Sequence, residues 1–377
     1  MPSLRETRPP PAVAGPSRAR DLVSGLILTA LSLGLLYLLL EAALGVVGGD
    51  SGVVLNVYNR TTTAGLDCYP SNPRGYFDLD LRDPATRERF DALRVRRVGD
   101  CATYAPHAVE LRYNSLQFRD REPGPRVPGV RRVAVLGDSF TEGQGVNEED
   151  AYPRVLERAL NQGGRRVEVL NFGRRGADFP ALRNTFEELL AFDPDVVVYG
   201  MMLNDCLPSD RFRARHSLVT TMLEGPRLKP DLVLGRPAFG VRTALFVRDR
   251  FETLRVNRAM TRWYGELYAE GNREGWQRTQ ADIWAMDRRM RMRGGHFLMV
   301  TWPVLAHLDG DYPFAAIHET VGRFAHAANI GWVDLLPALA GKRADDLWVH
   351  ALDPHPNARA HRLAAEAMAP AVRALLN

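Results

Sequence analysis

Cysteine is scarce in this chain, with three in 377 residues, and no surplus of one charge extends along it. A disulfide-dense miniprotein is therefore excluded. The net charge of +4 is 49 basic minus 45 acidic residues; the first twenty residues contribute +3, so the rest carries only +1 (45 minus 44). No overall basic field is left to bind nucleic acid. With 45% hydrophobic and 25% charged residues, the chain has the composition of a globular protein, which excludes disorder and collagen-like repeats.

Sequence signatures of phosphate and metal sites are missing as well. No glycine-rich loop of the kind that cradles phosphates follows an apolar run, which excludes a nucleotide-binding function. Four histidines show no ligand spacing with carboxylates or thiolates, so we expect neither a metal nor a cofactor. These four are His296, His307, His318 and His326.

Only one hydrophobic run is long enough to cross a membrane. Residues 22–40 are nineteen positions without a charge, and at 1.5 Å per residue a helix there spans about 28 Å. A cleaved signal peptide is the alternative, but the run is longer than a usual signal core and no small-x-small cleavage site follows it. A buried core helix is excluded because no polar face interrupts the run. We therefore expect a retained transmembrane helix at 22–44.

The charges around this run predict the side of the membrane on which the chain lies. Charges after the run are nearly balanced, whereas four arginines precede it, namely Arg5, Arg8, Arg18 and Arg20. By the positive-inside rule, residues 1–21 form a cytoplasmic tail, and the chain after the span lies outside the cytoplasmic (inner) membrane, in the periplasm or beyond. Residues 45–129 contain many prolines and predict a linker and a small irregular segment ahead of a domain at 130–377.

In that external compartment the three cysteines have two interpretations. Cys68 and Cys101 could form a disulfide across the irregular segment, which leaves Cys206 unpaired. The alternative is that all three are small buried apolar side chains. Spacing alone does not decide between them, because a disulfide requires a specific geometry.

From residue 130 onward, short apolar runs alternate with amphipathic segments. The expected strands are 133–136, 167–170, 196–199, 297–300 and 332–336. The expected helices are 152–160, 181–190, 283–292, 315–328 and 361–376. This alternation predicts an α/β fold, a three-layer α/β/α sandwich with a mainly parallel five-stranded sheet.

The third and fourth expected strands are too far apart for a single crossover. Their starts, 196 and 297, are 101 residues apart, which predicts a helical insertion at 206–275. This insertion holds thirteen basic and eight acidic side chains. One interpretation is a lid that contacts an anionic polymer or lipid headgroups through Arg248, Arg250 and Arg255. The other is a solvated helical insertion without a partner.

A serine follows the first expected strand, in the sequence Gly-Asp-Ser-Phe-Thr at 137–141. Ser139 therefore lies at the carboxyl end of a parallel strand, where open α/β sheets bind ligands. The Gly-x-Ser-x-Gly elbow is missing, which argues against the α/β-hydrolase fold. Taken alone, Ser139 could simply be a helix cap. We expect Asp138 beside it to support the turn.

Further polar residues follow the neighbouring strands. Gly176 comes after the second strand and Asn204 after the third, while Asp353 and His355 precede the last helix. An attacking serine needs a base to take its proton, an acid to orient that base, and donors for the oxyanion that develops. Each residue alone could be structural, but together they match that requirement.

In their order along the chain, these four blocks resemble those of the SGNH hydrolases, also called GDSL-type esterases, over about residues 130–377. The resemblance implies that Ser139 is the nucleophile and that its own N–H contacts the oxyanion. It implies that the Gly176 N–H and the Asn204 side chain supply two more oxyanion contacts. It also makes His355 the base, with Asp353 as the acid that orients it. Residues 113–122 resemble the segment that precedes this domain in membrane-tethered bacterial members.

Two positions depart from the family pattern. Met202 stands where the third block usually has glycine, and Asp353 stands two residues before His355 instead of three. Other groups near the last block that could serve are His350, His361 and Asp346. Cys206, beside the third block, is expected to be a bystander.

The resemblance implies a membrane-anchored serine enzyme whose substrate is an acylated carbohydrate or lipid. With water as acceptor, it is an esterase or deacylase. With a sugar hydroxyl as acceptor, it is an O-acyltransferase acting on envelope polysaccharide or glycolipid, and the choice depends on whether the insertion excludes water. A third alternative is a catalytically inactive glycan-binding or scaffold protein with the same fold.

Overall fold

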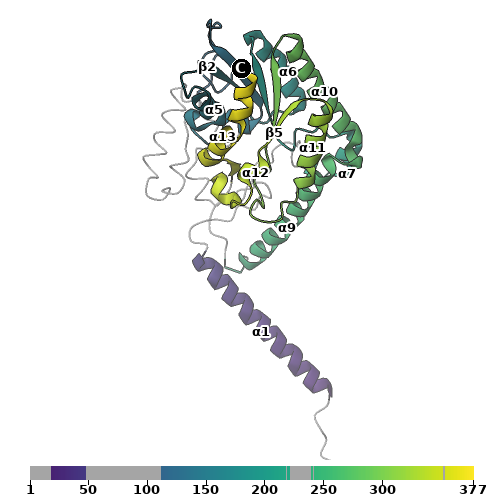
Figure 1. Ribbon diagram of the computed structural model, residues 1–377. Helices are drawn as coiled ribbons and strands as arrows, with labels where there is room; N and C mark the ends of the chain where they lie inside the picture. Colours follow the sequence, from purple (N-terminus) through teal and green to yellow (C-terminus); the bar gives the residue numbers. More distant parts are fainter. Residues whose placement is uncertain (1–17, 48–111, 218, 221–238, 241, 351–352) are drawn as a thin grey trace, which may run out of the picture.

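The computed structural model describes residues 18–47, 112–217, 219–220, 239–240, 242–350 and 353–377 (Figure 1). Its centre is a five-stranded sheet in the order β2-β1-β3-β4-β5, and every neighbouring pair is parallel. The strands are β1 (Arg131–Gly137), β2 (Val167–Gly173), β3 (Val196–Met201), β4 (His296–Thr301) and β5 (Gly331–Asp334). The predicted α/β fold with a parallel five-stranded sheet is confirmed, and its strand order is the flavodoxin-like one.

Buried side chains alternate between the two faces of this sheet. Ala134 and Leu136 of β1 belong to one core cluster, whereas Val133 and Val135 belong to the other. The main helices, which cover both faces, are α5 (Tyr152–Leu160), α6 (Phe179–Leu189), α10 (Arg273–Met292), α11 (Ala315–Ala327) and α13 (Ala358–Leu375). Helices α5 and α13 contribute to the second cluster, and α6, α10 and α11 to the first. The sheet is therefore the middle layer of three.

The observed elements differ from the predicted ones mainly at their ends. The fifth strand was expected to reach residue 336 but ends at Asp334, whose Oδ1 accepts a hydrogen bond from Leu336 N at 2.9 Å, where the short helix α12 (Leu336–Leu339) begins. Helix α10 begins ten residues before the expected 283 because its first half is mostly polar and lacks the apolar spacing used for prediction. An unpredicted antiparallel pair, β6 (Trp348–His350) and β7 (Asp353–Pro356), precedes α13.

The described part of the insertion is mainly helical. Helix α7 (Asp210–Arg215) is followed by the long helix α9 (Arg242–Leu267), which runs back to α10. The C-terminal half of α9 packs on the domain through buried Trp263 and Leu267. The side chains of Arg248 and Arg250 lie outside the described residues.

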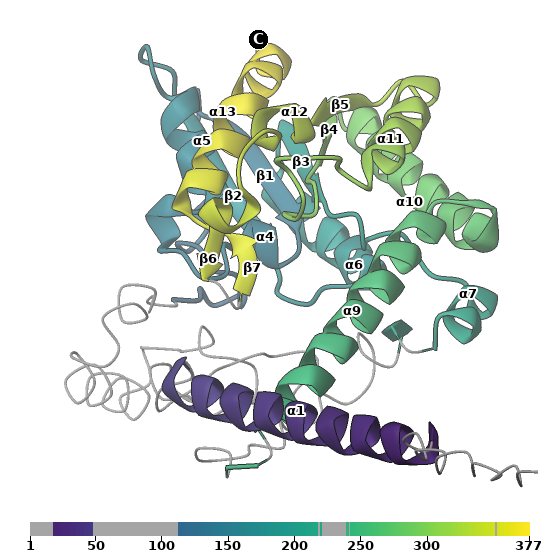
Figure 2. The same cartoon turned by 90° about the horizontal axis from the view of Figure 1, so that it is seen from below.

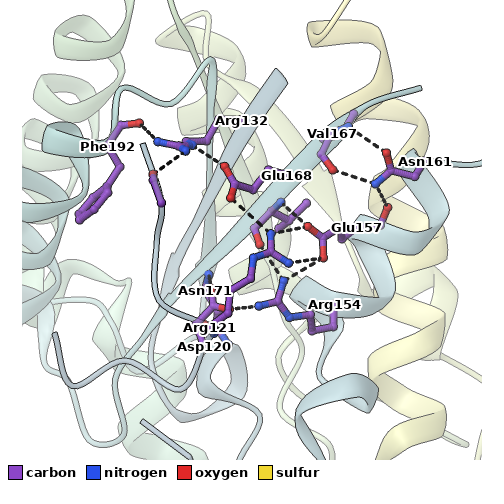
Figure 3. Close-up of polar contacts among 12 residues, drawn as sticks. Asp120, Arg121, Arg132, Arg154, Glu157, Asn161, Val167, Glu168, Asn171 and Phe192 are labelled. Atoms are coloured by element: carbon purple, nitrogen blue, oxygen red, sulfur yellow. Dashed lines mark hydrogen bonds and ion pairs between the residues drawn. The ribbon is translucent and has the colours of Figure 1, made fainter. Parts of the chain in front are cut away.

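Residues 112–130, the described residues directly ahead of β1, are tied to the domain by charged contacts (Figure 3). Asp120 pairs with Arg154 of α5 and accepts a hydrogen bond from the backbone N of Asn171 at 2.7 Å. Arg121 donates to both carboxylate oxygens of Glu157, at 2.6 and 3.0 Å. These contacts fasten residues 112–130 to β2 and α5, so that they pack as part of the folded domain.

One helix of the described chain is long and apolar enough to cross a membrane, from Arg20 to Leu44. It is most of α1 (Arg18–Val47), which extends away from the domain in Figure 1. Its leucines from Leu22 to Leu40 are exposed. Cys68 and Cys101 lie outside the described residues.

Candidate active site

Three glycines lie side by side at the carboxyl ends of the three adjacent strands β2, β1 and β3. Gly137 of β1 is in register with Gly173 on one side and with Gly200 on the other. A Cβ at any of them would overlap a neighbouring group: Thr141 Oγ1 over Gly137, the backbone N of Glu142 over Gly173, and the Tyr152 hydroxyl over Gly200. The glycines therefore let the turn that carries Ser139 lie directly against the strand ends.

Ser139 is the first residue of the short helix α4 (Ser139–Glu142), which follows β1 after one residue. That residue, Asp138, caps the helix, since its Oδ1 accepts a hydrogen bond from Phe140 N at 2.9 Å. Burial raises the pKa of Asp138 to about 6. Gly143 ends the helix with φ at 82°, a left-handed conformation that suits glycine. Asp138 thus supports the turn, as expected from the sequence.

The last block brings a histidine onto this serine. His355 lies in β7 and is half-buried, and its Nε2 is 2.9 Å from Ser139 Oγ. The aromatic ring of Phe140 packs against the imidazole of His355, with 5.5 Å between the two ring centres. On the far side of the imidazole, the side-chain amide of Gln144 lies 3.3 Å from Nδ1; its NH2 group donates to an unprotonated Nδ1, and its oxygen, after an amide flip, accepts from a protonated one. A serine hydroxyl within hydrogen-bond distance of an imidazole nitrogen is the arrangement that base-assisted nucleophilic attack requires.

The two residues expected as oxyanion donors follow the strands on either side of β1. Gly176 lies three residues after β2 and Asn204 three residues after β3, so the order β2-β1-β3 puts one on each side of the Ser139 turn. Both residues are exposed. Gly176 has φ at 69°, a conformation that side-chain-bearing residues rarely adopt. This place is the topological switch point, where open α/β sheets bind ligands.

Met202, which departs from the family pattern, is buried. Its side chain belongs to the core cluster that contains Phe140 and Trp302. Its backbone N donates to Asp205 Oδ2 at 3.0 Å. The hydroxyl of Tyr199 donates to the same oxygen at 2.7 Å, and burial raises the pKa of Asp205 well above its ordinary value. These hydrogen bonds to Asp205 fix the turn after β3 on its buried side, while Asn204 lies on its exposed side.

The structure places the candidate groups near the last block in different environments. Asp353 is in β7, two residues before His355, but its side chain lies outside the described residues, as does that of His350. Asp346 is exposed. His361 is fully buried on α13, where its Nδ1 accepts a hydrogen bond from Tyr152 N at 3.2 Å. Burial lowers the pKa of His361 to about 3, so this ring is a neutral part of the core.

A buried arginine, which the sequence analysis missed, braces the loop after Ser139. The Arg119 guanidinium donates to the carbonyl oxygens of Gly143 and Val146, at 2.5 and 2.6 Å. Beside it, Tyr113 donates to Glu142 Oε1 at 2.5 Å. Both lie in the segment 113–122, which the sequence analysis singled out only by resemblance. No sequence signal marks an arginine as buried, because its carbonyl partners are brought to it only by folding.

Within the described ranges, no three His, Cys, Asp or Glu side chains gather as a metal ion would require. Cys206 is buried, and its Sγ lies 3.4 Å from the carbonyl oxygen of Leu267. Burial raises the pKa of this thiol, which keeps it protonated and unreactive.

Comparison with known proteins gives a family match over most of the domain. The family model described as "GDSL-like Lipase/Acylhydrolase family" matches residues 135–363. Among curated proteins, an acetylxylan esterase of Xylanibacter ruminicola is 34% identical over 97 residues, which are 23% of this chain and 19% of that protein. The match therefore spans about a fifth of the length of that relative.

Solved structures resemble the chain more distantly. The acetylxylan esterase Axe2 of Geobacillus stearothermophilus is 15% identical, with a TM-score of 0.39, over 63% of this chain and 92% of that one. The esterase EstA of a Pseudoalteromonas species is 13% identical, with a TM-score of 0.39, over 66% of this chain and 99% of that one.

Proposed function

Because this chain belongs to the GDSL-like lipase/acylhydrolase family, we propose that it is a serine esterase that removes acyl groups through an acyl-enzyme at Ser139. The observation that carries the proposal is the 2.9 Å distance between Ser139 Oγ and His355 Nε2. This distance supports catalysis over a scaffold role, because binding alone does not require an imidazole nitrogen within hydrogen-bond distance of the Ser139 hydroxyl.

The reaction proceeds in two halves. Ser139 Oγ attacks the carbonyl carbon of the ester while His355 Nε2 takes the hydroxyl proton. The tetrahedral intermediate collapses, the alcohol leaves with the proton from His355, and the acyl group stays on Ser139. Water then attacks the acyl-enzyme with His355 again as base, which releases the carboxylic acid and restores the serine.

The oxyanion is stabilised by three donors in this proposal. They are the backbone N–H groups of Ser139 and Gly176 and the side-chain amide of Asn204. Such donors act most strongly when they are fixed in advance at the place where charge develops. The position of Gly176 and Asn204 after the two strands flanking β1 supports these roles. Asp353 holds the tautomer of His355 that carries its proton on Nδ1.

An O-acylated carbohydrate is the substrate class that we propose, with an acylated lipid as the alternative. The partial similarity to an acetylxylan esterase supports the carbohydrate. We further propose that α1 anchors the enzyme in the cytoplasmic membrane, with the N-terminus inside and the domain outside. The apolar helix from Arg20 to Leu44 and the arginines before it support that orientation.

A serine-directed fluorophosphonate tests the proposal. The full chain in detergent is treated with the probe, and the adduct is mapped by mass spectrometry, with Ser139→Ala as control. We expect one adduct, on Ser139, together with hydrolysis of p-nitrophenyl acetate that the variant lacks. Absence of an adduct on a folded chain would favour the inactive binding protein. Product analysis with an added acetylated xylo-oligosaccharide separates hydrolysis from transfer to a sugar hydroxyl.

A further inference from the structure

The outer end of α1 is joined to the beginning of the insertion helix α9. Glu41 of α1 is fully buried, and its two carboxylate oxygens accept hydrogen bonds from Gly240 N at 2.9 Å and Thr243 N at 2.5 Å. Tyr37, one turn earlier on α1, donates to the carbonyl oxygen of Gly240. The first N–H groups of a helix have no partner within it and carry partial positive charge. A carboxylate of α1 therefore caps α9, which rises from α1 toward the domain in Figure 2.

This junction fixes the height of α9 relative to the membrane. Glu41 lies three residues before Leu44, the end of the apolar span, a distance of about 5 Å along a helix. The beginning of α9 is thus at the level where hydrocarbon gives way to lipid headgroups. This step rests on the proposed membrane anchor, and it does not depend on the proposed chemistry at Ser139.

The first half of α9 carries an exposed apolar stripe. Val247, Phe251 and Leu254 are 59%, 66% and 56% exposed, and their spacing of four and then three residues puts them on one face of the helix. Phe251 and Leu254 precede Met260 and Trp263 by nine residues, which is two and a half turns. Because Met260 and Trp263 pack on the domain core, the stripe faces away from the domain.

The same face becomes basic farther from α1. Arg255, Arg258 and Arg262 continue the row from Phe251 at spacings of four, three and four residues, and all three are exposed. Exposed apolar side chains at one end of a face, with arginines beyond them, are typical of helices that lie at a membrane interface. The arginines suit the phosphates of anionic lipids.

We propose that this face of α9, together with Phe239, lies on the surface of the bilayer that α1 crosses. Phe239 is 60% exposed and directly precedes Gly240, whose backbone N donates to Glu41. The apolar side chains enter the interfacial layer, and Arg258 and Arg262 meet lipid phosphates. The continuity of the stripe with the membrane span selects the bilayer as its occupant. Two attachments, the Glu41 cap and the α9 face, then hold the domain in one orientation above the membrane.

Photo-crosslinking in vesicles tests this surface. The full chain is reconstituted in phosphatidylethanolamine–phosphatidylglycerol vesicles with p-benzoylphenylalanine in place of Phe251 or, separately, Leu254. Met292, 65% exposed at the end of α10, is the matched control. We expect adducts of lipid mass at 251 and 254 and none at 292. Equal lipid adducts at all three positions, or a crosslink from 251 to a second copy of the chain, would overturn the proposal.

A charged variant supplies an independent check. Phe251→Asp should abolish the lipid adduct at position 254 while leaving hydrolysis of soluble p-nitrophenyl acetate unchanged. An unchanged adduct would contradict a role for this face. Extraction of the chain from vesicles by alkaline carbonate would overturn both the anchor and this surface. Failure of the fluorophosphonate to label Ser139 would contradict only the esterase, so the two proposals fail separately.

Discussion

The hydroxyl of Ser139 lies 2.9 Å from Nε2 of His355, although 216 positions separate the two residues in the sequence. Ser139 is held by the turn after β1, an interior strand of the sheet, and His355 by the short strand β7 ahead of the last helix. Phe140 anchors the Ser139 turn in the core, and β7 is paired with β6, so both elements that make the contact are held in place.

Replacing His355 by alanine should lower kcat by about 10²- to 10⁴-fold, the usual contribution of a general base. Hydrolysis of p-nitrophenyl acetate measures the effect. His296, exposed at the start of β4, is the matched control, and His296→Ala should leave the rate unchanged. Equal rates for the His355 variant and the wild type would show that another group takes the proton.

Asn204→Ala should reduce kcat by about 10²- to 10³-fold, because one oxyanion donor is lost. The melting temperature should stay the same, since the Asn204 side chain is exposed. Asn257→Ala, at an exposed position of α9, controls for loss of an amide elsewhere. A variant that retains activity within a factor of a few would remove Asn204 from the site.

Gly173→Ala tests the glycine row under the catalytic turn. The added methyl group would overlap the backbone of Thr141 and Glu142, so we expect a loss of about 1–3 kcal/mol in the free energy of unfolding, together with reduced activity. Gly310→Ala, where a Cβ meets nothing within 4 Å, should change stability by less than about 0.5 kcal/mol. Urea denaturation of the two variants makes the comparison. Equal stability would mean that the turn does not rest on the strand ends.

His361 should make the protein more sensitive to acid. Its pKa is 6.5 ordinarily and about 3 when folded, so between these values the unfolded chain binds a proton that the folded chain does not. The free energy of unfolding therefore falls as pH drops through this window. Between pH 7 and pH 5 the loss from His361 alone is about 2 kcal/mol.

The variant His361→Gln isolates this contribution, since glutamine can also accept the hydrogen bond from Tyr152 N. Asp138, with its pKa raised to about 6, acts in the opposite direction but is present in both proteins. Urea denaturation at the two pH values should show a smaller loss for the variant. An equal loss in both proteins would contradict the buried, neutral state of His361.

Much of the fold could be predicted because apolar periodicity reports burial locally. The run at 133–136 lies inside β1, the run at 196–199 forms the first four residues of β3, and the helix at 152–160 was predicted to the residue. Element ends were less predictable. The first half of α10 and the pair β6–β7 have no distinctive periodicity, since their structure depends on what packs against them.

The sequence by itself determined the five strands, their parallel arrangement and the blocks around Ser139, Gly176, Asn204 and His355. Each strand and each block is a short stretch of neighbouring residues, and the alternation of strands with helices indicates the parallel arrangement. Tertiary structure alone decided which groups meet across the chain: the glycine row beneath Ser139, the buried Arg119 brace, and the Glu41 cap on α9. It also separated His355, at the serine, from His361, in the core. These outcomes depend on distances between segments far apart in sequence, and local patterns carry no information about such distances.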